Sequence, residues 1–205
     1  MGNVQKKEKR VYLLGDCQYE MIGVSHILRG LKFTPILLTT EVKGEDIMDA
    51  GLIILSLSSA PLLGWGKYID LIKKIKAISE SAIIIAIVPS IFKELSLLKP
   101  ICHVIDGGNP LDVINKDLSS ALNNETTIDI YLHGFKCFYD IYIQLAKLSH
   151  ASSNQLKCSH YYRRSRMVKL LGINHTHYFN LLSIHSGNSP LRTMFDKFYH
   201  QSLLV

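Results

Sequence analysis

The stretch that decides the fold is residues 52–61, Leu-Ile-Ile-Leu-Ser-Leu-Ser-Ser-Ala-Pro. Its apolar beginning is typical of a strand that is buried on both faces of a sheet, and the pattern predicts a strand from Leu52 to Leu57. The carboxyl ends of parallel strands usually carry the functional groups of open α/β proteins. Ser56 is therefore a reactive residue, an ordinary loop residue, or a position from which a reactive residue has been lost.

Other short apolar runs surround this stretch, most of them bounded by Gly, Pro, Ser or Asp. They predict four further strands, Val11 to Leu14, Pro35 to Thr39, Ala82 to Val88 and Ile101 to Ile105. Helical spacing of apolar residues lies between them, notably in Lys67 to Ser79 and after the helix cap Asn109. Strands alternating with helices predict an α/β domain over residues 10–122, with a five-stranded doubly wound parallel sheet.

The pattern changes at residues 121–129, where the composition turns polar, and we expect a linker at 123–128. The rest of the chain is basic, rich in Tyr and without alternating strands. We expect a small all-α domain at 129–186, a basic tail at 1–9 and a C-terminal tail at 187–205. The expected helices run from about Phe138 to Leu148, briefly near Ser152, from Cys158 to Leu171 with Gly172 ending it, and from His175 to Ile184.

Charge is unevenly distributed between the two parts. Residues 1–124 carry 14 Lys or Arg against 13 Asp or Glu, whereas residues 125–205 carry nine against four. Such a basic module suits phosphate backbones or an acidic partner. No apolar run reaches the roughly 18 residues of a membrane-spanning helix, and the first ten residues lack the apolar core of a signal peptide. The four cysteines show no CxxC spacing. We expect a cytoplasmic protein with free thiols and no membrane partner.

Residues 11–28 (VYLLGDCQYEMIGVSHIL) resemble the first strand and helix of a response-regulator receiver domain, and residues 52–72 resemble its third strand, loop and helix. In that family, two acidic residues after strand one hold Mg²⁺ and an Asp after strand three accepts the phosphoryl group. Strand four ends in Ser or Thr and strand five in Lys. The corresponding positions here are Gly15, Asp16, Ser56, Val88 and Asp106.

Only Asp16 keeps the residue type of that family. A serine is a poor nucleophile without an adjacent base, and an aspartate in place of the lysine would repel phosphate. The resemblance therefore implies a degenerate receiver-like domain that is not phosphorylated and holds no metal. A flavodoxin-like domain with unrelated strand ends remains the alternative.

Residues 163–182 (RRSRMVKLLGINHTHYFNLL) resemble the end of a LuxR-type helix-turn-helix domain, and residues 143–155 resemble its first helix, although the segment between them is about four residues shorter than in the family. Four residues form one helical stripe at i, i+3, i+4 and i+7, namely Lys157, His160, Tyr161 and Arg164. The resemblance implies that His160, Tyr161 and Arg164 lie near base edges, while Arg163, Arg166 and Lys169 reach phosphates. The complete predicted DNA-binding set is Lys157, Ser159, His160, Tyr161, Arg163, Arg164, Arg166 and Lys169. A solvated basic helix that binds nothing is the alternative.

Together the two parts resemble LuxR/FixJ-type two-domain regulators, in particular the RcsA, BglJ and GadE group of enterobacterial auxiliary regulators. This implies a transcription regulator, an activator of capsule, surface, virulence or stress genes, that binds double-stranded promoter DNA. It would act as a homodimer or as a heterodimer with a response regulator. An adaptor that modulates another response regulator without touching DNA is the alternative. We expect no enzyme, because no nucleophile, base and electrophile converge, and no cofactor. His175, His177 and His185 lack the spacing of metal ligands.

Overall fold

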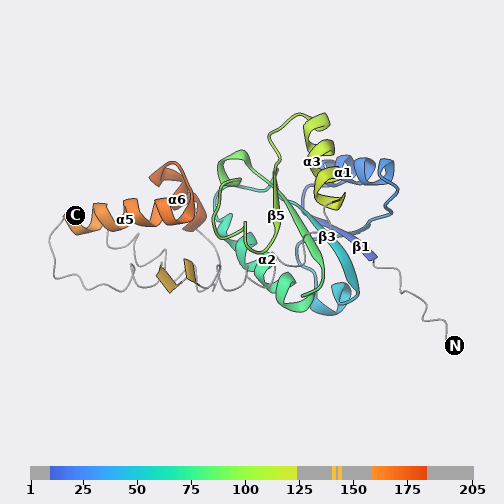
Figure 1. Ribbon diagram of the computed structural model, residues 1–205, viewed down its shortest axis with the longest axis horizontal. Helices are drawn as coiled ribbons and strands as arrows, with labels where there is room; N and C mark the ends of the chain where they lie inside the picture. The colour runs from blue at the N-terminus through green and yellow to red at the C-terminus, as the bar shows by residue number, and fades with distance from the viewer. Residues whose placement is uncertain (1–9, 124–139, 142, 145–157, 184–205) are drawn as a thin grey trace.

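A computed structural model of the chain describes residues 10–123, 140–141, 143–144 and 158–183 (Figure 1). Its centre is a sheet of five parallel strands in the order β2-β1-β3-β4-β5. The strands are β1 (Arg10–Gly15), β2 (Ile36–Leu38), β3 (Ala50–Ser56), β4 (Ile83–Val88) and β5 (His103–Asp106). The predicted five-stranded parallel α/β sheet is confirmed. The chain reverses its direction of winding between β1 and β3, which is the switch point of such a sheet.

Helices cover both faces of the sheet. Helices α1 (Gln18–Gly30) and α3 (Leu111–Asn123) lie on one face, and α2 (Gly66–Ile78) lies on the other (Figure 1). Side chains alternate along β3, so Ile54 packs toward α1 and α3 while Leu55 packs toward α2. All seven residues of β3 are buried because β1 and β4 pair with it on either side. This central position explains the continuous apolar run of the opening stretch.

The alternation of strands and α-helices is incomplete. The connection between β2 and β3 contains a 3₁₀ helix, η1 (Gly44–Ile47), and the one between β4 and β5 contains η2 (Ser90–Phe92) with turns after it. The latter segment lies between Pro89 and Pro100. Its leucines do not form one helical stripe, and they are buried in the core all the same. We call residues 89–100 the β4–β5 segment.

Two further helices, α5 (Cys158–Leu171) and α6 (Thr176–Ser183), lie where the sequence predicts helices. Gly172 comes directly after α5 with φ +70°, the left-handed conformation that ends a helix most easily with glycine. The predicted helices at 138–148 and near Ser152, the linker and both tails lie wholly or largely outside the described residues. The predicted domain boundaries therefore stay predictions.

Helices α5 and α6 pack against the α2 side of the sheet and share its core. Five residues of α5, α6 and the turn between them are buried in this core: Met167, Val168, Leu171, Ile173 and Leu182. Two backbone hydrogen bonds join them to the α/β unit, as Gly64 N–H donates to the carbonyl of Leu181 at 2.8 Å and Ser96 N–H donates to that of Leu171 at 2.9 Å. The end of α5 is thus held by the sheet region itself. No helix in the described part of the chain is long and apolar enough to cross a membrane.

Candidate functional site

The carboxyl edge of the sheet brings the five receiver-like positions together. Gly15 and Ser56 are register partners on β1 and β3, and Val88 and Asp106 are partners on β4 and β5. Asp16 comes directly after β1. The register is a consequence of the parallel pairing, since all five strands run in one direction and end at the same edge.

Ser56 is sealed within this edge. Its exposed fraction is 2%, and its Oγ has no hydrogen-bond partner among the described atoms. A Cβ on Gly15 would lie 2.9 Å from the Ser56 carbonyl oxygen and 3.0 Å from Cγ of Met21. A larger side chain at position 15, such as the acidic residue of a receiver domain, has no room there.

Asp16 is engaged by residues of two other segments. Thr40 donates to its Oδ1 from Oγ1 at 2.6 Å and from the backbone N–H at 3.2 Å, and the Tyr68 hydroxyl donates to Oδ2 at 3.2 Å. Partial burial raises the pKa of Asp16, but these hydrogen bonds outweigh it and leave the pKa below its ordinary value. Burial, and then the Asp16 charge, raise the pKa of Tyr68 to about 12. Asp16 therefore ties the β2–β3 connection and α2 to the end of β1.

Glu20 makes a second such connection, which the sequence analysis missed. Its carboxylate accepts hydrogen bonds from the Ser58 N–H at 3.0 Å, the Ser58 hydroxyl at 2.7 Å and the Ser59 N–H at 2.9 Å. Ser58 and Ser59 thus attach the loop after β3 to the first turn of α1. A signal was present in the sequence, because Glu20 lies in the first turn of the helix that follows β1, close to the carboxyl end of that strand.

Asp106 completes the carboxyl edge. It accepts hydrogen bonds from the Ser90 hydroxyl at 2.6 Å and the Gly108 N–H at 2.9 Å, and it forms an ion pair with Lys93 at 3.1 Å. Partial burial raises the pKa of Asp106, but these partners outweigh it and the pKa lies below its ordinary value. Lys93 was not singled out from the sequence, because nothing in a one-dimensional pattern aligns it with the end of β5.

The arrangement is a set of three carboxylates, each held by its own donors. A Cβ on Gly107 would collide with Ser58 and lie 3.0 Å from Ile87, so the loops after β3 and β5 touch each other. No group of His, Cys, Asp or Glu in the described ranges is arranged to hold a metal ion. The described edge therefore consists of closely packed loops whose carboxylates already have hydrogen-bond donors.

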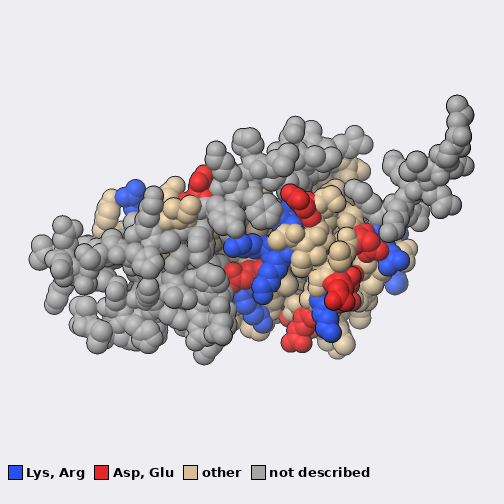
Figure 2. Space-filling view, turned by 90° about the horizontal axis from the view of Figure 1, so that it is seen from below, with Lys and Arg blue, Asp and Glu red and all other residues tan. Residues whose placement is uncertain are grey.

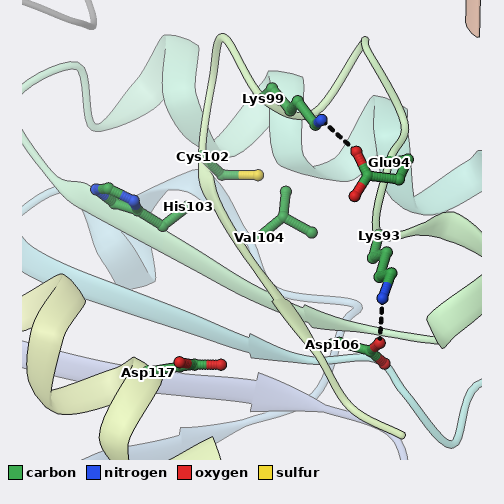
Figure 3. A pocket seen from close by; sticks show the side chains of 8 residues that line it. All are labelled: Lys93, Glu94, Lys99, Cys102, His103, Val104, Asp106 and Asp117. Atoms are coloured by element: carbon green, nitrogen blue, oxygen red, sulfur yellow. Dashed lines mark hydrogen bonds and ion pairs between the residues drawn. The ribbon is translucent and has the colours of Figure 1, made fainter. Parts of the chain in front are cut away.

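An open pocket of about 380 Å³ lies beside the edge strand β5, between the β4–β5 segment and α3 (Figure 3). Both lysines that line it are paired, Lys99 with Glu94 and Lys93 with Asp106 (Figure 3). Burial raises the pKa of the Cys102 thiol and lowers that of the His103 imidazole, which disfavours the charged form of each. The pocket therefore presents no activated nucleophile.

Most of the predicted DNA-binding residues fall where side chains are not described. Lys157 lies outside the described residues, and Ser159, His160, Tyr161, Arg163 and Arg164 are described only as backbone positions of α5. Arg166 and Lys169 are exposed. Of the three histidines, His175 and His177 lie beside the ring of Tyr178, and His185 is outside the described part of the chain.

The described part of α5 has two distinct faces. Met167, Val168 and Leu171 are buried against the sheet region. Tyr162, Arg166 and Lys169 occupy positions i, i+4 and i+7, and all three are exposed, with Tyr162 at 63%. We call these three residues the α5 stripe. Tyr162 was not predicted, because sequence spacing alone did not reveal which side of α5 is covered.

The stripe predicted from the sequence consists of other residues. Of that stripe, His160, Tyr161 and Arg164 are described only as backbone positions of α5, so the stripe stays a prediction. Basic and acidic residues are interspersed over the described part of the face seen in Figure 2. The α5 stripe, by contrast, contains two cations and no acid.

Comparison with known proteins adds no family. No protein-family model matches the chain, and no curated protein matches it. One solved structure, a yeast Spc42 trimeric coiled-coil segment (amino acids 181–211) fused to another structure, is similar with a TM-score of 0.42 and 16% sequence identity. The match covers 68% of this chain and 97% of that one.

Proposed function

We propose that the protein is a DNA-binding transcriptional regulator. Its α/β unit is not phosphorylated and instead mediates dimerisation or pairing with a response regulator. The observation that carries this proposal is the α5 stripe, which presents Arg166 and Lys169 to solvent while the opposite face of α5 is anchored in the core.

An anchored helix with a basic outer face is suited to the grooves and backbone of DNA. Arginine and lysine provide the phosphate contacts that position a protein on a duplex, and a tyrosine beside them adds a hydrogen-bonding hydroxyl. The segment Cys158–Leu171 contains no acidic residue that would repel phosphate. The excess of positive charge in residues 125–205 acts in the same direction at longer range.

The carboxyl edge supports control without phosphate. Its carboxylates are occupied by Thr40 and Tyr68, by the Ser58–Ser59 loop, and by Ser90 and Lys93. Ser56 provides neither a carboxylate nor an accessible hydroxyl. Regulation then comes from the choice of partner or from the abundance of the protein.

The test is a titration of labelled promoter DNA with the full-length protein at several salt concentrations. Binding through phosphates releases counterions, so the affinity should fall steeply as salt rises. Arg166→Ala and Lys169→Ala should each weaken binding and lower the salt slope by about 0.9. Lys74→Ala removes an exposed lysine from α2 and serves as the matched control. No binding at low salt, with or without a candidate partner, would overturn the proposal.

An adaptor that never touches DNA is the second candidate, and one observation favours it. Met167, Val168 and Leu171 belong to the core of the sheet region, which makes the end of α5 an integral part of the α/β unit rather than of a separate helical module. In that case the α5 stripe would meet an acidic protein surface. A pull-down with a response regulator in the absence of DNA distinguishes the two, because only an adaptor loses its partner when Arg166 and Lys169 are both replaced by Ala.

A further inference from the structure

Gly23 lies near the middle of α1, where neither the backbone conformation nor a close described neighbour requires glycine. A glycine inside a helix is less favourable than alanine because it loses more backbone freedom on folding. Its backbone does not have the positive φ that requires glycine, unlike that of Gly172. A Cβ at Gly23 would meet no atom within 4 Å, whereas one at Gly15 or Gly107 would meet close neighbours. No described residue of the chain therefore accounts for this glycine.

The neighbours of Gly23 indicate what covers it. Tyr19 and Ile22 are 89% and 63% exposed, which is unusual for two large apolar side chains on one helix surface. They flank Gly23 on the outer side of α1, while Met21 and Val24 are buried beneath the helix. Together Tyr19, Ile22 and Gly23 form a notch between apolar side chains, and we call these three residues the α1 notch. Such a notch lets the backbone of another helix approach closely.

The charges around α1 favour a second copy of the same chain as the partner. Asp16 and Glu20 lie toward the amino-terminal end of α1, where neutral donors leave their negative charges in place, and the exposed His26 and Arg29 lie after the notch. In an antiparallel pair crossing at Gly23, Arg29 of one copy lies opposite position 17 of the other, between the two carboxylates. Both positions are about 9 Å along the helix from the crossing point. A parallel pair would instead bring the Arg29 side chains of the two copies against each other.

We infer that the protein forms a two-fold symmetric dimer in which the α1 helices of two copies pack antiparallel, with the two Gly23 residues at the crossing. A two-fold contact uses the same patch on both subunits, and α1 is self-complementary in this one orientation. The tyrosine and isoleucine side chains become buried across the contact, and the acidic and basic ends pair. The inference rests on the proposed function only in assigning this dimer to DNA binding, and its test needs no DNA.

The test is sedimentation equilibrium of the full-length protein, comparing wild type with Gly23→Leu and Arg29→Glu. Leucine favours the helix, and no described residue lies within 4 Å of the Cβ position, so the thermal midpoint of Gly23→Leu should not fall. The same side chain blocks the close approach, so the dimer dissociation constant should rise about tenfold or more. Arg29→Glu should also weaken the dimer. Ala77→Leu adds the same residue at an exposed site on α2 and should leave association unchanged.

A cysteine variant tests the geometry directly. In a Cys17→Ser background, Gly23→Cys should form a disulfide between two copies under mild oxidation, because the two positions meet at the symmetry axis. A protein that stays monomeric at all concentrations would overturn the inference. So would a dimer that Gly23→Leu leaves unchanged, or one that Ala77→Leu weakens equally. A dimer that binds no DNA would contradict the proposed function alone.

Discussion

Gly15 and Ser56 are register partners at the ends of β1 and β3, and they are so close that a Cβ on Gly15 would lie 2.9 Å from the Ser56 carbonyl oxygen. In the resemblance to receiver domains proposed from the sequence, these two positions correspond to a metal-binding carboxylate and the phosphoryl acceptor. Here the same place is closed by backbone and by Met21. Because of this close packing, we expect substitutions at Ser56 to change the free energy of unfolding and the Ser56 hydroxyl to be unreactive.

Substitutions at Ser56 should have opposite effects on stability. Its buried hydroxyl makes no hydrogen bond, so Ser56→Ala should leave the free energy of unfolding unchanged or raise it by up to about 1 kcal/mol. Ser56→Asp would bury a carboxylate without a partner and should lower that free energy by about 3 kcal/mol or more. Urea unfolding of both variants measures the difference. A stable Ser56→Asp protein would show that the edge opens more readily than its packing indicates.

Acetyl phosphate should leave the protein unmodified, with or without Mg²⁺. Ser56 is buried and is no carboxylate, and Asp106 at the end of β5 is an anion that would repel a phosphoryl donor. Intact-mass spectrometry after incubation measures the result, with a phosphorylatable receiver domain as the positive control. Recovery of an acyl phosphate on any carboxylate of this edge would contradict the prediction.

Asp106 should make stability depend on pH in the acid range. Its pKa in the folded protein lies below the ordinary value of 3.8, so its contribution is fully present above that value and is lost as the pH falls through the lowered pKa. Asp106→Asn should cost about 1–3 kcal/mol at pH 7, because the ion pair with Lys93 is lost and the remaining hydrogen bonds go to a neutral acceptor. The variant should also show a shallower decline in stability below about pH 4. Denaturant unfolding at a series of pH values tests both effects, and parallel curves would contradict the assignment.

The docked end of α5 should unfold together with the sheet. Trp65, the single tryptophan, is fully buried 4.8 Å from the Phe92 ring, in the core that α5 and α6 complete. Fluorescence and far-ultraviolet circular dichroism should therefore report one coincident transition. Two separated transitions would show instead that the helices unfold independently of the sheet.

Gly172→Ala should weaken this docking. Alanine is strained at φ +70°, which costs roughly 1–2 kcal/mol, and its Cβ would collide with the Glu94 carbonyl oxygen. We expect a fall of several degrees in the thermal midpoint, since a chain of this size loses about 2–4 °C per kcal/mol. Gly30→Ala is the matched control, because nothing lies within 4 Å of its Cβ position. Equal midpoints for the two variants would exclude a structural role of the α5 terminus.

The salt dependence of DNA binding should separate the members of the α5 stripe. Arg166→Ala removes a cation and should reduce the salt slope by about one ion. Tyr162→Ala removes a neutral side chain and should lower affinity at every salt concentration while leaving the slope unchanged. Fluorescence anisotropy across a salt series measures both quantities. A changed salt slope for Tyr162→Ala would indicate that the substitution displaces the helix instead of removing a single side-chain contact.

Part of the candidate site could be predicted from the sequence. The ends of parallel strands meet at one edge, so Gly15, Asp16, Ser56 and Asp106 were expected to gather there, and the register of the sheet brings them together. The donors that occupy these groups could not be predicted. Thr40 lies 24 residues from Asp16, and Lys93 lies 13 positions from Asp106 on a connection without regular periodicity. Hydrogen bonds between loops depend on distances that no local pattern contains.

The amino-acid sequence alone determined the five strands, their parallel arrangement and the helices α5 and α6. A strand buried on both faces needs a continuous apolar run, and a helix buried on one face needs apolar residues at helical spacing, so both patterns can be read locally. Only the tertiary structure decided that the strand ends are closed and that the end of α5 docks on the sheet. It also decided that Tyr162, Arg166 and Lys169 form the exposed side of that helix. An amphipathic pattern states that one face of a helix is covered. Which face is covered, and by what, depends on the packing of residues far apart in the chain.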